Sequence, residues 1–253
     1  MSRLAASSHR DGAAVKAVLA ELLPDPLFYR LAALVLRWQE AELRHLRAFV
    51  PTDRLALDVG AWWGPWTFWL SRHARGVVAV EPQPLLADFL RRVVNSRVDV
   101  RCIALSDVAG IADLVVPSSH RGQDALAHLL RNDDEAGATL QTVSVARIDD
   151  LGLDDVGFIK IDVEGHEQQV IAGAAELLER DRPTILVEIE QRHLGSTPID
   201  DVFASLRAHG YSGLYRARRR WCPLETFDVE RDQLAVLPNL NSRRYVNNFL
   251  FVP

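Results

Sequence analysis

The sequence predicts an α/β protein built on a Rossmann-like, doubly wound, mostly parallel β-sheet, with a helical N-terminal cap and extra C-terminal strands. Three observations lead to this prediction. Short apolar runs alternate with helical patterns from residue 54 onward, a glycine turn follows the first run, and an acidic residue ends the second. With 253 residues, of which 48% are hydrophobic, the chain can bury a full core, and its two cysteines provide no disulfide framework.

Residues 1–50 are expected to form the helical cap, and residues 51–253 the main domain. Apolar residues recur at helical spacing in the cap, Pro24 interrupts the pattern, and a second helix is expected over residues 27–49. The apolar stripe of this second helix could pack on its own domain or join two copies of the chain as a homodimer.

The main domain is expected to begin with two strand–helix units and a third strand. In order, these elements are strand 55–59, helix 65–73, strand 76–80, helix 84–95 and strand 98–104. Each predicted strand is a short run that is mostly apolar, and the proline at the start of the first helix suits its first turn.

The second half of the domain continues the alternation. Its predicted elements are strands 111–116, 142–146, 158–161, 183–189, 211–217 and 245–252, with helices 166–180 and 199–209. Parallel strands joined by helices form right-handed βαβ units, so both faces of the sheet should be covered. The polar stretch 117–141 is expected to be a loop that could close over the site as a lid.

Composition excludes several classes of protein. The net charge is −5, from 29 basic and 34 acidic residues, so no global basic field is available for a nucleic acid. The strongest basic run, residues 216–221, is read as a solvated hairpin face or a phosphate contact. The longest early apolar run covers only residues 31–36, which predicts no membrane span. No targeting segment is recognised at the N-terminus, so the expected location is cytoplasmic.

The sharpest local signal is the glycine turn of residues 57–64, which follows the first predicted strand. Gly60 and Gly64 are spaced as G-x-x-x-G, Asp58 precedes them, and Glu81 ends the second strand, where an acidic residue commonly holds ribose hydroxyls. A carboxylate at this loop would repel a pyrophosphate but would attract the amino group of S-adenosylmethionine. The charge therefore favours a methyl donor over NAD(P), and the alternatives are a dehydrogenase and a turn that binds no ligand.

Five segments in order resemble the FkbM-type methyltransferases, a class I family that depends on S-adenosylmethionine. The segments are Asp58-Val59-Gly60-Ala61, Val80-Glu81-Pro82-Gln83-Pro84, Ala104-Leu105-Ser106-Asp107, Ile148-Asp149-Asp150-Leu151 and Ile159-Lys160-Ile161-Asp162-Val163-Glu164-Gly165. The resemblance covers residues 54–190 and implies O-methylation of a hydroxyl on a sugar, glycolipid or natural product.

The resemblance also implies which residues hold the donor. The implied donor-binding residues are Asp58, Gly60, Ala61, Trp62, Gly64, Glu81, Pro82, Ser106, Asp107 and Asp162. Ser106 and Asp107 are expected near the adenine. The family usually has asparagine where this chain has Trp62, which keeps open the alternative of a non-catalytic scaffold that binds S-adenosylmethionine.

A second acidic group follows the fourth buried strand of the parallel series. Asp162, Glu164 and His166 lie there, and any of them could take a proton from an acceptor hydroxyl. Alternatively, Asp162 and Glu164, with Glu188 or Glu190 from the next strand, could hold Mg²⁺, which prefers oxygen ligands.

The segment of residues 188–193 is a second candidate wall of the site. His193 could be a base at the acceptor site, a surface residue or a partner of a loop carbonyl, and Glu188 shares a strand face with Glu190. Glu167 is expected to cap a helix, since acidic side chains stabilise helix N-termini.

Four of the six tryptophans fall between residues 62 and 69. Trp66 and Trp69 share a helix face and are expected in the core. Either Trp62 or Trp63 is expected to face the donor pocket, where an indole ring could attract the sulfonium.

Overall fold

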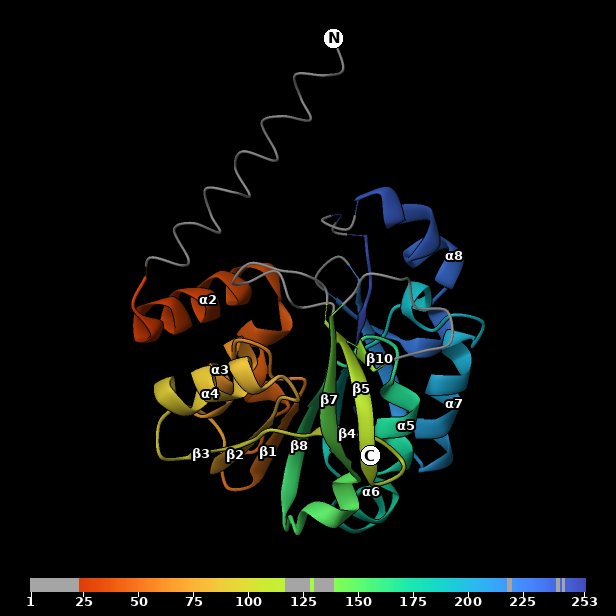
Figure 1. Cartoon of the computed structure of the whole chain (residues 1–253). Helices are drawn as coiled ribbons and strands as arrows, with labels where there is room; N and C mark the ends of the chain where they lie inside the picture. Colours follow the sequence, from red (N-terminus) through yellow and green to blue (C-terminus); the bar gives the residue numbers. More distant parts are fainter. Residues whose placement is uncertain (1–22, 117–127, 130–138, 218–219, 240–241, 243) are drawn as a thin grey trace.

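A computed structural model describes residues 23–116, 128–129, 139–217, 220–239, 242 and 244–253 (Figure 1). It confirms the Rossmann-like α/β fold, with an eight-stranded main sheet and a four-stranded second sheet. The short helix predicted before Pro24 lies outside the described residues.

The main sheet has the strand order β11-β10-β12-β9-β8-β1-β2-β3. Its strands are β1 Leu55–Val59, β2 Gly76–Val80, β3 Val98–Arg101, β8 Val156–Ile161, β9 Thr184–Glu188, β10 Ser212–Ala217, β11 Arg220–Pro223 and β12 Asn248–Val252. The five strands from β9 to β3 are parallel to one another, and β12, β10 and β11 add an antiparallel edge.

The strand order reverses at β1. The chain passes from β1 to β2 and β3 on one side, then returns to place β8 and β9 on the other side. Val59 pairs with Val80 of β2 and with Ile161 of β8, so all three strands end at one level. Ligands of doubly wound sheets bind in the crevice at such a switch point.

Helices cover both faces of this sheet (Figure 1). The α-helices are α2 Asp25–Gln39, α3 Pro65–Leu70, α4 Pro84–Val93, α5 Glu167–Ala172, α6 Ala175–Asp181, α7 Ile199–Ala208 and α8 Val229–Asp232. The 3-10 turns are Glu42–Arg44, Leu46–Ala48, Ile148–Leu151, Gln191–His193, Leu224–Thr226 and Leu234–Asn239. Helices α3 and α4 lie on one face beneath α2, and α5, α6 and α7 lie on the other.

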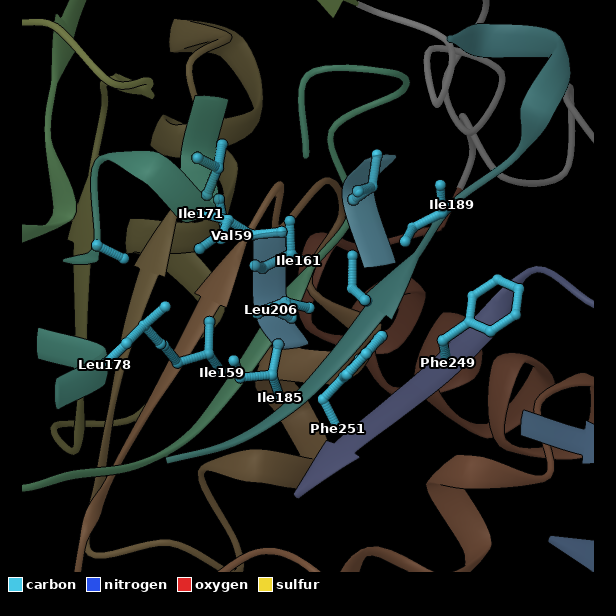
Figure 2. Packing of buried hydrophobic residues seen from close by; sticks show 14 of the residues in the cluster. Val59, Ile159, Ile161, Ile171, Leu178, Ile185, Ile189, Leu206, Phe249 and Phe251 are labelled. Atoms are coloured by element: carbon cyan, nitrogen blue, oxygen red, sulfur yellow. The ribbon is translucent and has the colours of Figure 1, made fainter. Parts of the chain in front are cut away.

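The core follows the alternation of side chains along each strand. Val59, Ile159 and Ile161 point toward α5, α6 and α7, where they join Ile171, Leu178 and Leu206 (Figure 2). Ala56, Val77 and Phe158 point the other way, toward α3 and the turns that follow α2. Burial on both faces explains why these strands read as continuous apolar runs in the sequence.

The helix predicted over residues 27–49 is wrong at its C-terminal end. Helix α2 stops at Gln39, and Arg44 donates hydrogen bonds to the carbonyls of Arg37 and Trp38, at 3.2 and 2.9 Å. These carbonyls therefore bond to a side chain and not to further helical N–H groups. The outer face of α2 is exposed, with Trp38 86% accessible, and a homodimer through this face stays a prediction.

The strand predicted over residues 98–104 divides between the two sheets. β3 ends at Arg101, and β4 Ala104–Leu105 belongs to the second sheet, whose order is β4-β7-β5-β6. The other strands of this sheet are β5 Gly110–Val116, β6 His128–Leu129 and β7 Thr139–Ala146. The loop predicted over residues 117–141 thus contains β6 and the start of β7. The rest of it lies outside the described residues, and so does the predicted lid.

The helix predicted over residues 166–180 is two helices, α5 and α6, which are separated at Gly173. A Cβ atom on Gly173 would lie 2.0 Å from the carbonyl oxygen of Ser106, so the backbone packs too closely there for any larger residue.

The basic run of residues 216–221 lies on the hairpin of β10 and β11, at one edge of the main sheet. Arg218 and Arg219 of this run lie outside the described residues. In the part of the chain that the structure describes, no helix is long and apolar enough to cross a bilayer.

Candidate active site

A cavity of about 240 Å³ opens at the switch point, where β1, β2 and β8 end. Its walls come from the glycine turn after β1, the loop after β2, the segment after β8 and the end of α2. The strand ends that the sequence singled out therefore meet at one cavity.

The glycine turn bends sharply through left-handed backbone. Gly60, Trp62 and Gly64 have φ values of 77°, 49° and 79°. The backbone N–H groups of Gly60 and Ala61 both donate to the carbonyl of Val80 at 3.0 Å, which fixes the turn against β2. Asparagine adopts this conformation more readily than tryptophan, so Trp62 stands where the backbone favours the residue usual in the resembled family.

Glu81 is buried and fixed in place by the backbone. Its carboxylate accepts hydrogen bonds from the N–H of Trp62 at 2.8 Å and from the N–H of Gln83 at 2.9 Å. Because Glu81 also lines the cavity, its carboxylate lies where hydroxyl groups of a ligand could contact it.

Asp58 lies beneath the glycine turn and is 1% exposed. Burial raises the pKa of Asp58 to about 6, against the lowering effect of the hydrogen bond that it accepts from the Thr67 hydroxyl. A positive charge in the cavity would lower this pKa again and favour the carboxylate.

The structure separates the four clustered tryptophans. Trp62 lines the cavity, whereas Trp63 packs edge-on against Phe28 and Phe89, with ring centroids 5.3 and 4.8 Å apart. Trp69 is half-buried beside Ala33, to whose carbonyl its Nε1 donates at 2.8 Å. Trp66 is buried as expected, but it also lines the cavity.

His166 and Ser106 meet at the side of the cavity near β4. The Ser106 hydroxyl donates to Asp107 at 2.9 Å, and His166 Nε2 lies 2.9 Å from the same hydroxyl oxygen. The histidine predicted as a candidate base therefore contacts Ser106, and its role as a base stays a prediction.

Lys160 occupies the position between the two carboxylates expected to bind Mg²⁺. Its Nζ lies 3.5 Å from Asp162 Oδ2 and 3.7 Å from Glu188 Oε2, and its side chain is 1% exposed. Burial alone would lower the pKa of Lys160, but Asp162 and Glu188 outweigh this effect and raise it. A metal ion would have to displace this ammonium. No group of three or more metal-ligating side chains is present among the described residues, so the Mg²⁺ interpretation is not supported.

The remaining predicted residues form pairs beside the cavity. Glu164 lines it and contacts His193 Nδ1 in an ion pair, and His193 does not line it. Glu190 accepts hydrogen bonds from Arg192 and Tyr245, away from the cavity. Glu167 accepts a hydrogen bond from the Gly165 N–H at 2.7 Å, in the turn that precedes α5.

Glu40 is a residue of the cavity that the sequence reasoning missed. It follows α2, lines the cavity and accepts a hydrogen bond from Trp66 Nε1 at 2.8 Å. No local pattern marks it, because the contact depends on how α2 packs on α3.

Comparison with known proteins gives a consistent family signal. The family model described as "Methyltransferase FkbM domain" matches residues 58–212. The 31-O-demethyl-FK506 methyltransferase FkbM of Streptomyces tacrolimicus is 30% identical over 206 residues, which are 67% of this chain and 76% of that protein. The AMB antimetabolite synthetase AmbE of Pseudomonas aeruginosa is 28% identical over 207 residues, which are 64% of this chain but only 10% of that protein.

Among solved structures, a methyltransferase FkbM from Methylobacillus flagellatus is similar in fold. The TM-score is 0.51 at 16% sequence identity, and the match covers 94% of this chain and 58% of that one. At this identity the likeness concerns the fold alone.

Proposed function

Because the chain belongs to the FkbM family of methyltransferases, we propose that it transfers the methyl group of S-adenosylmethionine to a hydroxyl of a small acceptor. The acceptor class that we propose is a sugar, a glycolipid or another natural product. The name of the relative 31-O-demethyl-FK506 methyltransferase indicates methylation at an oxygen, and this supports the choice of an oxygen acceptor for this chain.

The observation that carries this proposal is the charge of the cavity. Six carboxyl groups line it, and Lys160 is the one lysine or arginine among the described lining residues. These carboxylates would repel the pyrophosphate of a dinucleotide, and Lys160 already contacts Asp162 and Glu188. S-adenosylmethionine has no phosphate and carries a sulfonium and an ammonium group, so the charge supports it as the donor.

The donor would lie across the end of β1. Glu81 would hold the ribose hydroxyls, and the side of the cavity near Ser106 would hold the adenine. The methionine part would pass over Gly60 toward Asp162, within reach of the Asp58 charge. Trp62 would form one wall of this path.

The acceptor would approach from the side of β8 and β9. Methyl transfer requires the acceptor oxygen, the methyl carbon and the sulfur to lie in one line, so positioning contributes most of the catalysis. Asp162 and Glu188, each held by Lys160, would orient the hydroxyl groups of the acceptor.

The two rival functions are a dehydrogenase and a non-catalytic scaffold. Membership of a methyltransferase family argues against the dehydrogenase. The non-catalytic scaffold would bind the donor without transferring its methyl group.

Calorimetric titration with S-adenosylmethionine, S-adenosylhomocysteine and NAD⁺ tests the proposal first. We expect S-adenosylmethionine and S-adenosylhomocysteine to bind and NAD⁺ not to bind. If the protein does not bind S-adenosylmethionine even at millimolar concentration, the proposal is rejected. Incubation with methyl-labelled donor and a panel of glycosides and polyols then tests turnover. Donor binding without transfer to any member of a broad panel would favour the scaffold.

A further inference from the structure

Glu40 brings a carboxylate to the cavity from outside the family domain. The family model begins at residue 58, whereas Glu40 directly follows α2 in the N-terminal cap. Trp66 Nε1 donates to Glu40 Oε2 at 2.8 Å and so aims the carboxylate toward the cavity that both residues line. The Trp66 ring in turn lies 5.7 Å from Lys160 Nζ, on the side of the cavity near β8.

Glu40 differs from the other carboxylates on this side in having an indole N–H, and not the Lys160 ammonium, as its direct partner. Asp162 and Glu188 both contact Lys160, and Glu188 also accepts a hydrogen bond from Asn247 Nδ2 at 2.5 Å. Glu40 makes no direct ion pair with Lys160, whose charge reaches it over a longer distance. Its second oxygen, Oε1, accepts no hydrogen bond from any residue that the structure describes. This oxygen can therefore accept a proton at this end of the cavity.

The charges around Glu40 are mostly negative. Lys160 and Asp162 face it from β8, Glu188 from β9, and Glu42 from the turn that follows α2. Burial, Asp162 and Glu42 raise the pKa of Glu40 to about 8, against the lowering effects of Lys160 and Trp66. A cation placed beside Glu40 would favour its charged form and would release a proton at neutral pH.

We infer that Glu40 is a catalytic residue of this site, which takes the proton of the acceptor hydroxyl during methyl transfer. This inference rests on the proposed function. A lone pair of the acceptor oxygen forms the new C–O bond, and the electrons of the C–S bond return to sulfur, which becomes a neutral thioether. The hydroxyl proton passes to Glu40 Oε1 and converts the carboxylate to a carboxylic acid. No oxidant or reductant is needed.

The inference can be tested without knowing the acceptor. Proton release on ligand binding is measured by calorimetry at neutral pH in two buffers of different ionisation enthalpy. S-adenosylmethionine carries a positive sulfur and S-adenosylhomocysteine does not, so the wild-type protein should release more protons with the first. Glu40→Gln should lose this difference, and Glu176→Gln, which removes an exposed carboxylate on the first turn of α6 that does not line the cavity, should keep it.

Each result bears on the inference. An undiminished difference in Glu40→Gln would overturn the role of Glu40 while leaving donor binding, and thus the proposed function, in place. Absence of donor binding by the wild-type protein would overturn both. If Glu40→Gln fails to fold, Trp66→Phe serves instead. It removes the hydrogen bond that lowers the pKa of Glu40, so the difference in proton release should move to higher pH, and an unmoved profile would count against the inference.

A kinetic measurement follows for any acceptor that the panel identifies. Glu40→Gln should lower kcat about 100-fold with the KM of the donor unchanged, because a missing base affects proton transfer and not donor binding. It should also remove the rise of activity with pH, and Glu40→Asp should restore part of it. A change confined to KM would contradict a role in proton transfer.

Discussion

Gly60 packs directly against the backbone carbonyl of Asp162. A Cβ atom on Gly60 would lie 1.8 Å from that oxygen, and the N–H of Asp162 donates to the carbonyl of Val59 at 3.0 Å. The glycine turn after β1 and the acidic segment after β8 are therefore joined through their backbones. The proposed donor loop and acceptor side cannot move apart independently at this point.

Gly60→Ala is expected to be severely destabilising. The methyl group would overlap the Asp162 carbonyl, and the φ of 77° adds backbone strain. We expect a loss of more than about 3 kcal/mol in the free energy of unfolding, measured by chemical denaturation.

Gly152→Ala is the matched control for this substitution. Gly152 also has a positive φ, 64°, but no atom lies within 4 Å of the position that a Cβ atom would take there, so only the strain of about 1–2 kcal/mol applies. Equal losses in the two variants would show that the contact with Asp162 contributes nothing.

The residues that the sequence identified are those that follow local patterns. Gly60, Glu81 and Asp162 each come directly after a buried strand, and the parallel strand order brings such positions to one edge of the sheet. The alternation of apolar runs and helices was sufficient to predict the three strands β1, β2 and β8 that these residues follow.

The residues that the sequence missed depend on packing between distant segments. Glu40 reaches the cavity because Trp66, 26 positions away, holds it, and no periodicity records that contact. The sequence around Lys160 does not show whether its side chain points to solvent or into the protein. The structure buries it between Asp162 and, on the neighbouring strand β9, Glu188. The helix over residues 27–49 was predicted too long because Leu43 and Leu46 keep apolar spacing through 3-10 turns.

Lys160→Met is expected to be strongly destabilising. The ammonium is buried between Asp162 and Glu188, and its removal leaves two carboxylates without their cation. Breaking a buried ion pair in this way costs about 3–5 kcal/mol. Arg75→Met, which removes an exposed partner of Asp155, should cost less than about 1 kcal/mol.

Urea denaturation of the two variants measures both losses. The pKa of Glu188, already raised by burial, should rise further in Lys160→Met, so the deficit should shrink as the pH is lowered. A Lys160→Met protein as stable as Arg75→Met would mean that the buried ammonium is not needed to balance these carboxylates.

Glu81→Ala and Asp162→Ala should divide donor binding from turnover. Glu81 holds the backbone of Trp62 and Gln83 and faces the proposed ribose position, so its loss should weaken donor binding about 10- to 100-fold. Asp162→Ala should bind the donor with little change and lose methyl transfer. Calorimetry and the labelled-donor assay measure the two quantities, and equal losses of binding in both variants would reject this division of roles.

Glu167→Gln should change how stability depends on pH. Glu167 is 1% exposed, and burial raises its pKa from 4.5 to about 7. The native state therefore holds a proton that the unfolded state releases, so the wild-type protein loses stability as the pH rises from 4.5 to about 7. At about 1.4 kcal/mol per pKa unit, this loss is on the order of 1–3 kcal/mol. Glutamine removes the ionisation and can still accept the hydrogen bond from the Gly165 N–H.

The free energy of unfolding, measured in urea from acidic to slightly alkaline pH, should accordingly decline less in Glu167→Gln than in the wild-type protein. Glu176→Gln, on the exposed first turn of α6, is the matched control and should follow the wild-type curve. A Glu167→Gln curve parallel to the wild-type curve would show that Glu167 ionises as easily in the folded chain as in the unfolded one. Its carboxyl group would then have to be reached by water, which its burial in the turn before α5 argues against.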